Sequence, residues 1–226
     1  MLNHALPILL GFLLLSACGS PQNRQGNRDT PDTAPNAETP IVETKNILFF
    51  GTSLTAGHGL DDKSLAFPGL IQQRIDSLGL PYRVINGGLS GETSAAGNER
   101  IDWLLNEKID IFVLELGAND GLRGIDTQET YKNLQRIIDK VKQQYPDCQM
   151  VLAGMMVPPS MGGAYGHAFS AMFPKLAEEN NMVFVPFLLE RVAGEIDLNL
   201  QDGIHPNERG HQIMANTVWE ALYPLL

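Results

Sequence analysis

Short apolar runs alternate with segments of helical spacing from residue 44 to residue 226. The first run, residues 46–50, is almost entirely apolar and stops at Gly51, which is typical of a parallel strand buried on both faces. Further strands are expected at residues 82–85, 109–116, 150–153 and 182–185. This alternation predicts one α/β domain of three layers, with helices on both faces of a central, mostly five-stranded parallel sheet.

The segments between these strands carry the signals of helices. Residues 65–78 have helical spacing and end at Gly79, while residues 126–129 resemble a capping box that opens another helix. The apolar positions are Leu70, Ile71, Ile75 and Leu78 in the first and Leu134, Ile137, Ile138 and Val141 in the second. Helices are also expected at residues 99–105 and 207–222. Because ligands bind at the carboxyl ends of the strands in such sheets, the polar motifs after the strands are expected to gather at one edge.

The first 43 residues are expected to lie outside the folded domain. Residues 6–15 form an apolar run that is too short to cross a bilayer and fits the core of a secretion signal, although no Lys or Arg precedes it. The segment Leu15-Ser16-Ala17-Cys18 resembles a bacterial lipobox, in which Cys18 becomes the lipidated first residue of the mature protein. An ordinary cleaved signal with an incidental cysteine is the alternative.

We therefore predict three regions: a signal peptide at residues 1–17, a lipidated Cys18 with a tether at residues 18–43, and a domain at residues 44–226. The tether is rich in Pro, Asn, Gln, Thr and Asp, and it holds too few apolar residues to form a core. This organisation implies secretion across the inner membrane. It also implies attachment by more than one acyl chain, at the periplasmic face of the outer membrane or at the cell surface.

Charge and composition exclude several functions. The formal net charge is −10 and no basic patch occurs, which argues against nucleic-acid binding. If Cys18 is lipidated, Cys148 has no partner for a disulfide within the chain and is expected at a strand edge. His58, His167 and His211 lack metal-ligand spacing, so no zinc site is expected. We expect His167 on a surface loop and His211 on the last helix.

A carboxylate and an imidazole lie within one turn of backbone in the segment Asp202-Gly203-Ile204-His205-Pro206. Gly203 and Pro206 indicate a fixed loop. Asp202 can accept a hydrogen bond from Nδ1 of His205, which leaves Nε2 free to take a proton from a hydroxyl group. The pair is two thirds of a hydrolase triad; the alternative is a polar turn that caps the last helix.

A serine follows the first predicted strand in the segment Gly51-Thr52-Ser53-Leu54. At a strand-to-helix turn such a serine is exposed, and its own N–H can help to bind an oxyanion. The alternative is a serine that caps a helix. The segment is not a Walker loop, because no Gly-Lys-Ser/Thr follows, and it is not a G-x-S-x-G elbow, because Thr55 replaces the second glycine.

Two further polar motifs follow the second and third strands. The glycine-rich turn at residues 86–94 can offer an unobstructed backbone N–H. The segment 115–124 contains Asn119, whose side chain offers another N–H. The alternative for Asn119 is a loop residue that stabilises its own turn.

Four motifs thus occur in order, each after a predicted strand. They are Gly51-x-Ser53-Leu54, Gly91, Gly117-x-Asn119-Asp120 and Asp202-x-x-His205. Each motif alone is weak, but the ordered set resembles the SGNH (GDSL) hydrolase family over about residues 46–211. The segments 115–124 and 202–207 are similar to the branch of bacterial arylesterases and multifunctional acyl thioesterase/lysophospholipases.

The resemblance implies a flavodoxin-like fold and a role for each site residue. Ser53 would be the nucleophile, His205 the general base and then the acid, and Asp202 the residue that orients His205. The oxyanion hole would consist of the backbone N–H groups of Ser53 and Gly91 and the side chain of Asn119. Thr52 stands where the family commonly has Asp, which we expect to alter the surrounding hydrogen bonds rather than the reaction. No cofactor or metal is implied.

We therefore expect a lipid-anchored serine esterase that acts on small acyl esters or thioesters through an acyl-enzyme. A carbohydrate O-acetylesterase on the same fold and a catalytically silent binding lipoprotein are the alternatives. The methionine-rich run at residues 155–163 follows the fourth strand and fits either an acyl groove or ordinary core and loop.

Overall fold

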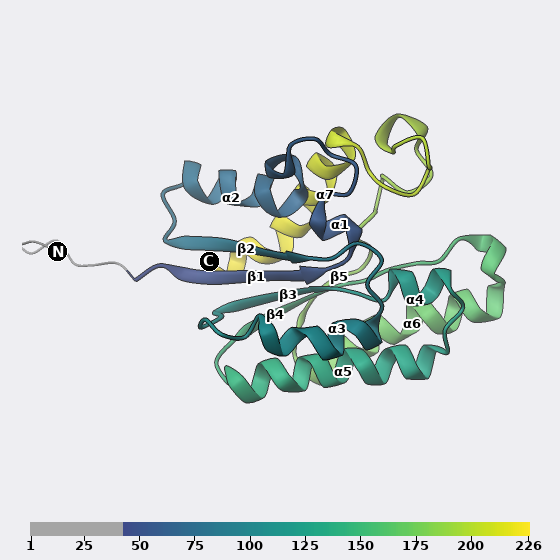
Figure 1. Cartoon of the computed structure of the whole chain (residues 1–226), viewed down its shortest axis with the longest axis horizontal. Coiled ribbons are helices and arrows are strands. Elements are labelled where there is room, and N and C mark those ends of the chain that lie inside the picture. The colour runs from purple at the N-terminus through teal and green to yellow at the C-terminus, as the bar shows by residue number, and fades with distance from the viewer. Residues whose placement is uncertain (1–42) are drawn as a thin grey trace, which may run out of the picture. The chain divides into compact units, whose positions relative to one another are not determined.

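The structure, a computed structural model, describes residues 43–226. The predicted signal peptide, the predicted lipidation site Cys18 and the tether up to residue 42 lie outside the described residues. The described part is a domain in which one sheet separates two groups of helices (Figure 1). This three-layer α/β/α arrangement confirms the predicted fold class.

All five strands are parallel, in the order β2-β1-β3-β4-β5. They are β1 Lys45–Gly51, β2 Tyr82–Gly88, β3 Ile111–Glu115, β4 Gln149–Ala153 and β5 Val183–Val185. The apolar run of β1 is fully buried because β1 lies inside the sheet and is covered on both faces. The strand order is the flavodoxin-like one, whose switch point between β1 and β3 is where a ligand is expected to bind.

Seven helices cover the two faces of the sheet in the described part of the chain. One group comprises α1 Ser53–Ala56, α2 Phe67–Ser77 and α7 Glu208–Leu222 (Figure 1). The other comprises α3 Ser94–Arg100, α4 Ala118–Leu122, α5 Thr127–Gln144 and α6 Gly163–Asn180. The apolar face predicted for α5 is confirmed, because all four of its positions are buried. On α2, Ile71 and Ile75 are buried and Leu70 is partly buried, but Leu78 was wrongly included: it lies just beyond the helix and is exposed.

The helix predicted at residues 99–105 is wrong in its bounds. α3 begins earlier, because the side chain of Thr93 accepts a hydrogen bond from the N–H of Ala96 at 3.3 Å and caps the helix. Gly97 packs so closely that an added Cβ would lie 2.6 Å from the side chain of Leu116. Residues 101–103 form a separate 3-10 turn, so the apolar spacing there reflects burial rather than a continued helix.

The sequence patterns do not indicate α6, although it has 18 residues. Gly163, Gly166 and Pro174 weaken its helix signal, because glycine and proline are the poorest helix formers. Its stability comes from tertiary packing of four large side chains, which are Phe169, Met172, Phe173 and Leu176. His167, which we expected on a loop, lies on this helix with its side chain exposed.

His211 lies on α7, as predicted, and is buried. Cys148 directly precedes β4 and is half-buried.

Between residues 43 and 226, no helix combines the length and apolar character needed to cross a bilayer. The same residues contain no group of three or more His, Cys, Asp or Glu side chains placed to hold a metal ion.

Candidate active site

Ser53 is the first residue of α1, directly beyond the carboxyl end of β1. Thr52, not Ser53, occupies the N-cap position, so the alternative of a capping serine is wrong. The turn brings the half-buried Ser53 to the edge of the sheet beside the switch point. A hydroxyl group at this edge faces the segments that follow the neighbouring strands.

Ser53, His205 and Asp202 form one continuous chain of hydrogen bonds. Nε2 of His205 lies 2.9 Å from Oγ of Ser53, and Nδ1 of His205 lies 2.7 Å from Oδ2 of Asp202. The two contacts use opposite nitrogens of one imidazole ring. With the Nδ1 proton directed at the carboxylate, Nε2 is the nitrogen left to accept a proton from Ser53.

The loop around Asp202 is fixed by its own backbone. Oδ1 of Asp202 accepts hydrogen bonds from the N–H groups of Ile204 at 2.9 Å and His205 at 3.0 Å, and Gly203 adopts a φ of +68°. The hydrogen bond from the backbone N–H of His205, followed by those from its side chain and from Ile204, lowers the pKa of Asp202 well below its usual range. Asn207, not Asp202, caps α7 through the N–H groups of Arg209 and Gly210.

A second imidazole covers one face of His205. The ring centroids of His58 and His205 are 4.4 Å apart with an angle of 46° between the planes. The backbone N–H of His58 also donates to the carbonyl of Ser53 at 2.9 Å. From the sequence, His58 is considered only as a metal ligand and is excluded as one. The contact with His205 could not be predicted, because the two residues lie far apart along the chain.

The three N–H donors predicted for the oxyanion hole belong to Ser53 and to the segments that follow β2 and β3 at the same edge of the sheet. Gly91 has a φ of +80°, and nothing lies within 4 Å of the place where its Cβ would be. Within the described part of the chain, the backbone N–H groups of Ser53 and Gly91 have no hydrogen-bond acceptor. Asn119 donates one N–H of its amide to the carbonyl of Glu92 at 3.0 Å, which leaves the second N–H available. The arrangement is suited to bind an oxyanion.

Asn119 lies on the short helix α4 rather than on a loop. Its hydrogen bond reaches the neighbouring loop, so the alternative that it only stabilises its own turn is wrong. That loop is held in turn by Arg123, whose Nη2 donates to the carbonyl of Gly91 at 3.0 Å. The segment after β3 therefore donates two hydrogen bonds to the loop after β2, and these tie the two segments together.

A largely buried ion pair between Arg100 and Glu92 also holds the loop after β2. Nε and Nη2 of Arg100 each donate to the carboxylate of Glu92 at 2.6 Å, and Nη2 also donates to the carbonyl of Gly87 at 2.7 Å. The guanidinium carbon lies 4.4 Å from the ring centroid of Phe50. The bidentate geometry and the additional acceptor satisfy the buried charges. Neither residue stands out in the sequence, because Glu92 and Arg100 each look like a surface charge.

Glu115 is a further buried carboxylate that the sequence patterns do not identify. It ends β3, is 1% exposed, and accepts hydrogen bonds from Thr52 and Thr55. Burial raises its pKa to about 7, although these hydrogen bonds act in the opposite direction. The hydroxyl group of Thr52 donates to Glu115; that this differs from the hydrogen bonds of relatives with Asp at this position stays a prediction.

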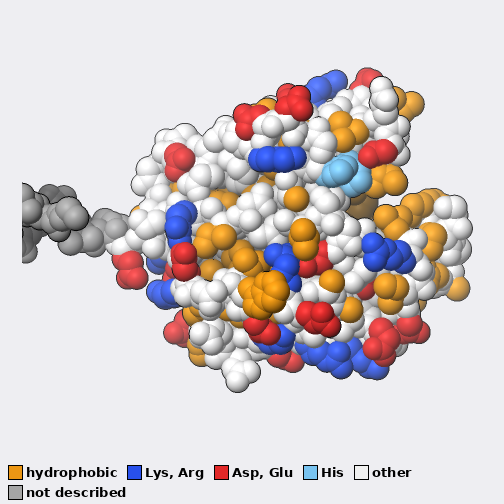
Figure 2. Space-filling view, in the orientation of Figure 1, with side chains coloured by type: hydrophobic (Ala, Val, Ile, Leu, Met, Phe, Trp, Pro, Cys, Tyr) orange, Lys and Arg blue, Asp and Glu red, His pale blue; other side chains and the backbone are white. Residues whose placement is uncertain are grey.

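The methionine-rich run after β4 divides into two parts. Met155 is 2% exposed and belongs to the core, whereas Met156 is 54% exposed. Exposed apolar side chains also occur within or next to the three other site segments, at Leu89, Leu122 and Ile204. Figure 2 shows histidine surface beside a hollow whose opposite side is largely hydrophobic. Met155 therefore fits the alternative of ordinary core, whereas the acyl-groove interpretation of Met156 stays a prediction.

Residues 49–213 match the family described as GDSL-like lipase/acylhydrolase. Esterase TesA of Pseudomonas aeruginosa is 37% identical over 189 residues, covering 83% of this chain and 92% of that protein. The Escherichia coli protein named thioesterase 1/protease 1/lysophospholipase L1 is 36% identical over 181 residues, covering 80% of this chain and 84% of that protein. The crystal structure of the psychrotrophic esterase EstA from Pseudoalteromonas, inhibited by monoethylphosphonate, is 29% identical and superposes with a TM-score of 0.75, covering 80% of this chain and 97% of that one.

The fold and the arrangement of side chains define a class of hydrolase in which a serine lies at the carboxyl edge of a flavodoxin-like sheet. The chain belongs to the GDSL-like lipase/acylhydrolase family, whose members are also called SGNH hydrolases. The resemblance predicted from the four motifs is thereby confirmed.

Proposed function

We propose that the protein is a serine esterase that hydrolyses small acyl esters and thioesters through a covalent acyl-enzyme. The observation that carries the proposal is the hydrogen-bonded chain from Asp202 through His205 to Ser53. It ends at a hydroxyl group on the edge of the sheet where the segments that carry Gly91 and Asn119 also lie. The names of the esterase and thioesterase relatives support the same reaction class.

Each residue has a defined part in the reaction. Oγ of Ser53 attacks the acyl carbonyl carbon while its proton passes to Nε2 of His205. The negative charge on the carbonyl oxygen is bound by the oxyanion hole of Ser53, Gly91 and Asn119. His205 then returns the proton to the departing alcohol or thiol, which leaves the acyl group on Ser53. Water attacks this acyl-enzyme with His205 again as base, the acid departs, and Ser53 regains its proton.

Asp202 stays ionised during both steps. The two largest contributions to its lowered pKa are hydrogen bonds from His205, the residue that it orients, and Ile204 adds a third. The carboxylate therefore stabilises the imidazolium form of His205 that exists while each proton is in transit.

The decisive test is Ser53→Ala. We expect loss of ester hydrolysis and loss of labelling by a fluorophosphonate probe, because the nucleophile is removed. A far-ultraviolet circular dichroism spectrum and a melting temperature equal to those of the unmodified protein show that the fold is kept. Full activity in Ser53→Ala would sink the assignment, and failure of the folded wild-type protein to be labelled would favour a binding protein without catalysis.

The same triad and fold also suit a carbohydrate O-acetylesterase. The exposed apolar side chains of Leu89, Leu122, Met156 and Ile204 favour acyl groups over sugars, since they offer apolar surface and no hydrogen bonds to hydroxyl groups. Rates on medium-chain p-nitrophenyl esters and acyl thioesters, compared with rates on acetylated xylan, separate the two. A preference for acetylated xylan would favour the carbohydrate esterase.

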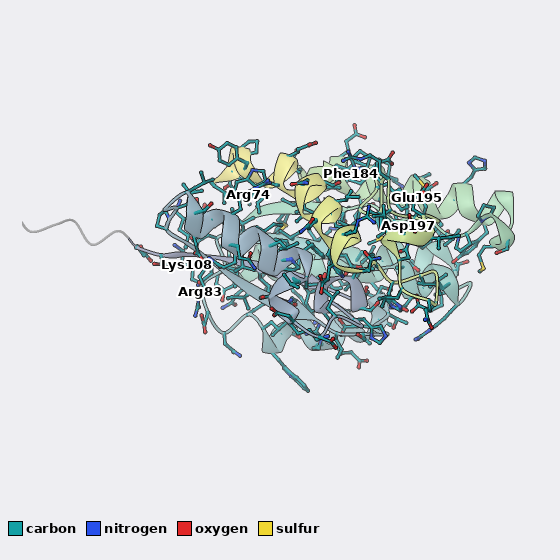
Figure 3. The ribbon with its side chains drawn as sticks, turned by 90° about the horizontal axis from the view of Figure 1, so that it is seen from above. Arg74, Arg83, Lys108, Phe184, Glu195 and Asp197 are labelled. Carbon is teal, nitrogen blue, oxygen red and sulfur yellow. The ribbon has the colours of Figure 1, made fainter. Side chains whose placement is uncertain are left out.

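We further propose secretion and anchoring through a lipidated Cys18. The sequence Leu15-Ser16-Ala17-Cys18 and the tether composition support this organisation. The first strand, β1, begins at Lys45, at the end of the sheet where the strands start. Arg83 and Lys108 lie at this end, whereas Glu195 and Asp197 lie toward the opposite end (Figure 3). A tether joined at this edge is compatible with substrate access to the carboxyl ends of the strands. Cys18→Ser is expected to move the protein from the membrane fraction to the soluble fraction with its activity intact.

A further inference from the structure

The buried carboxylate of Glu115 binds the turn that carries Ser53 from both sides of the serine. Oε2 accepts hydrogen bonds from the N–H of Thr52 at 2.8 Å, the N–H of Thr55 at 3.2 Å and the hydroxyl group of Thr55 at 2.7 Å. Oε1 accepts one from the hydroxyl group of Thr52 at 2.9 Å. The four donors belong to the residue before Ser53 and to the residue two positions after it.

Gly51 shows that space is reserved for this carboxylate. A Cβ on Gly51 would lie 2.5 Å from Oε2 of Glu115 and 2.2 Å from Oγ1 of Thr55. Any side chain at position 51 would therefore displace the contacts between Glu115 and the turn. The glycine that opens the serine motif is required here by the carboxylate behind the serine.

The contacts match an ionised carboxylate. An ionised carboxylate only accepts hydrogen bonds and has about four lone-pair positions, whereas a protonated one carries an O–H donor of its own. The two backbone N–H groups can only donate, whereas the two threonine hydroxyl groups can also accept. Protonation of Glu115 would therefore require one threonine hydroxyl group to reverse its hydrogen bond. Burial opposes the charge and raises the pKa of Glu115 to about 7, which leaves the charge state sensitive to pH near neutrality.

We propose that Glu115, as a carboxylate, is a positioning residue that holds the turn of residues 52–55 so that Ser53 faces His205 and the oxyanion hole. The inference rests on the proposed function, since it assigns a role in the same reaction. Glu115 contacts neither the substrate position nor His205, and it acts through Thr52 and Thr55. The family commonly has an acidic residue at position 52, whose negative charge would repel the carboxylate of Glu115. Thr52 instead contributes a hydrogen-bond donor.

Few titratable groups surround Glu115. The neighbouring strand ends contribute Gly51 from β1 and Ala153 from β4, and α1 contributes only threonines and Ser53 besides apolar residues. On α4, Asp120 is held by Ser94 and Thr130. In the loop after β2, Glu92 is paired with Arg100. The ionisable groups nearest the serine turn itself are His205, which contacts Ser53, and His58, whose ring packs against His205. Lys63 donates to the carbonyl of Gly57 at the end of α1.

The pH dependence of kcat/KM tests the proposal, because activity then requires both His205 and Glu115 to be deprotonated. We expect the wild-type acidic limb, plotted as log(kcat/KM) against pH, to approach a slope of two. In Glu115→Gln, which keeps the shape but cannot ionise, we expect a slope of one and a kcat lowered about 10- to 100-fold, with KM changed little. Circular dichroism and melting temperature establish that the variant is folded.

Two results would overturn the proposal. They are a wild-type slope of one, and a Glu115→Gln variant that keeps either the wild-type kcat or a slope of two. Ser53→Ala, measured in the same series, separates failure of the proposed esterase function from failure of the role of Glu115. If Ser53→Ala is active, the proposed function fails; if it is inactive and the slopes do not differ, only the role of Glu115 fails.

A second variant keeps the test decisive if Glu115→Gln does not fold. Thr55→Val removes one donor to the carboxylate and nearly preserves the side-chain shape. Because hydrogen bonds to the ionised form lower its pKa, we expect the acidic limb to move to higher pH. Thr55→Ser keeps the hydroxyl group and is expected to keep the wild-type position of the limb. An unmoved limb in Thr55→Val contradicts the proposal.

Discussion

His205 is contacted at both nitrogens and on one face. Asp202 binds Nδ1, Ser53 binds Nε2, and the ring of His58 lies 4.4 Å away, centroid to centroid. The ring therefore cannot rotate without losing at least one contact.

The side chain of Asn119 is the proposed side-chain donor of the oxyanion hole. We expect Asn119→Ala to lower kcat by roughly 10²- to 10³-fold with a smaller effect on KM, since one donor to the transition-state charge is lost. The measurement is steady-state kinetics on a p-nitrophenyl ester. Asn106→Ala is the matched control, because Asn106 also donates from Nδ2 to a backbone carbonyl, that of Trp103. An unchanged kcat in Asn119→Ala would remove this residue from the hole.

At the scale of elements, the helices differ in how much of their stability is local. α5 has an N-cap and a continuous apolar face, so its sequence alone identifies it. α1 and α4 are single turns of four and five residues, too short to be stable by themselves. They exist because tertiary contacts hold them, and these two turns carry Ser53 and Asn119.

The capping box predicted at α5 is half present. The side chain of Asp126 accepts hydrogen bonds from the N–H groups of Gln128 and Glu129, but the carboxylate of Glu129 pairs with Lys132. We expect Asp126→Ala to lower the free energy of unfolding by about 1 kcal/mol, the usual cost of a lost N-cap. Urea denaturation measures this. Asp126→Asn should retain most of the stability, and kcat should be unchanged in both variants.

At the scale of the whole molecule, two buried groups make stability depend on pH in opposite directions. Burial lowers the pKa of His211 from 6.5 to about 4 and raises the pKa of Glu115 from 4.5 to about 7. As the pH falls below about 6.5, the unfolded chain binds a proton at His211 that the folded protein does not bind, so His211 destabilises the fold. Glu115 binds its proton more tightly in the folded state, so its contribution is lost as the pH rises through about 7.

His211→Gln isolates the first of these contributions. Gln can still accept the hydrogen bond that the N–H of Phe67 donates to Nδ1 of His211 at 3.2 Å. Relative to this variant, the free energy of unfolding of the wild-type protein is expected to fall by up to about 3 kcal/mol between pH 6.5 and pH 4. Urea denaturation at a series of pH values measures the difference. A difference that stays constant with pH contradicts a buried, neutral His211.

The inner strands β1, β3 and β4 were predictable because their apolar runs are buried on both faces of the sheet. The edge strands β2 and β5 are only partly buried, and their short apolar segments carried a weaker signal. The helix α6 was not predictable, because Gly166 and Pro174 weaken its helix signal and tertiary packing supplies its stability. The triad residues were predictable from short motifs at strand ends. Glu115, Glu92 and Arg100 were not, because a buried charge and a surface charge look identical in a sequence.

The sequence by itself determined the alternation of strands and helices, the four motifs and hence the family. These features follow from local patterns that a single segment carries. Only the tertiary structure decided that His205 lies 2.9 Å from Ser53, that Glu115 is buried behind the serine, and that Met155 is core while Met156 is exposed. The burial and the hydrogen-bond partners of these residues depend on which distant segments of the chain come together at the carboxyl edge of the sheet. A local sequence pattern does not contain that information.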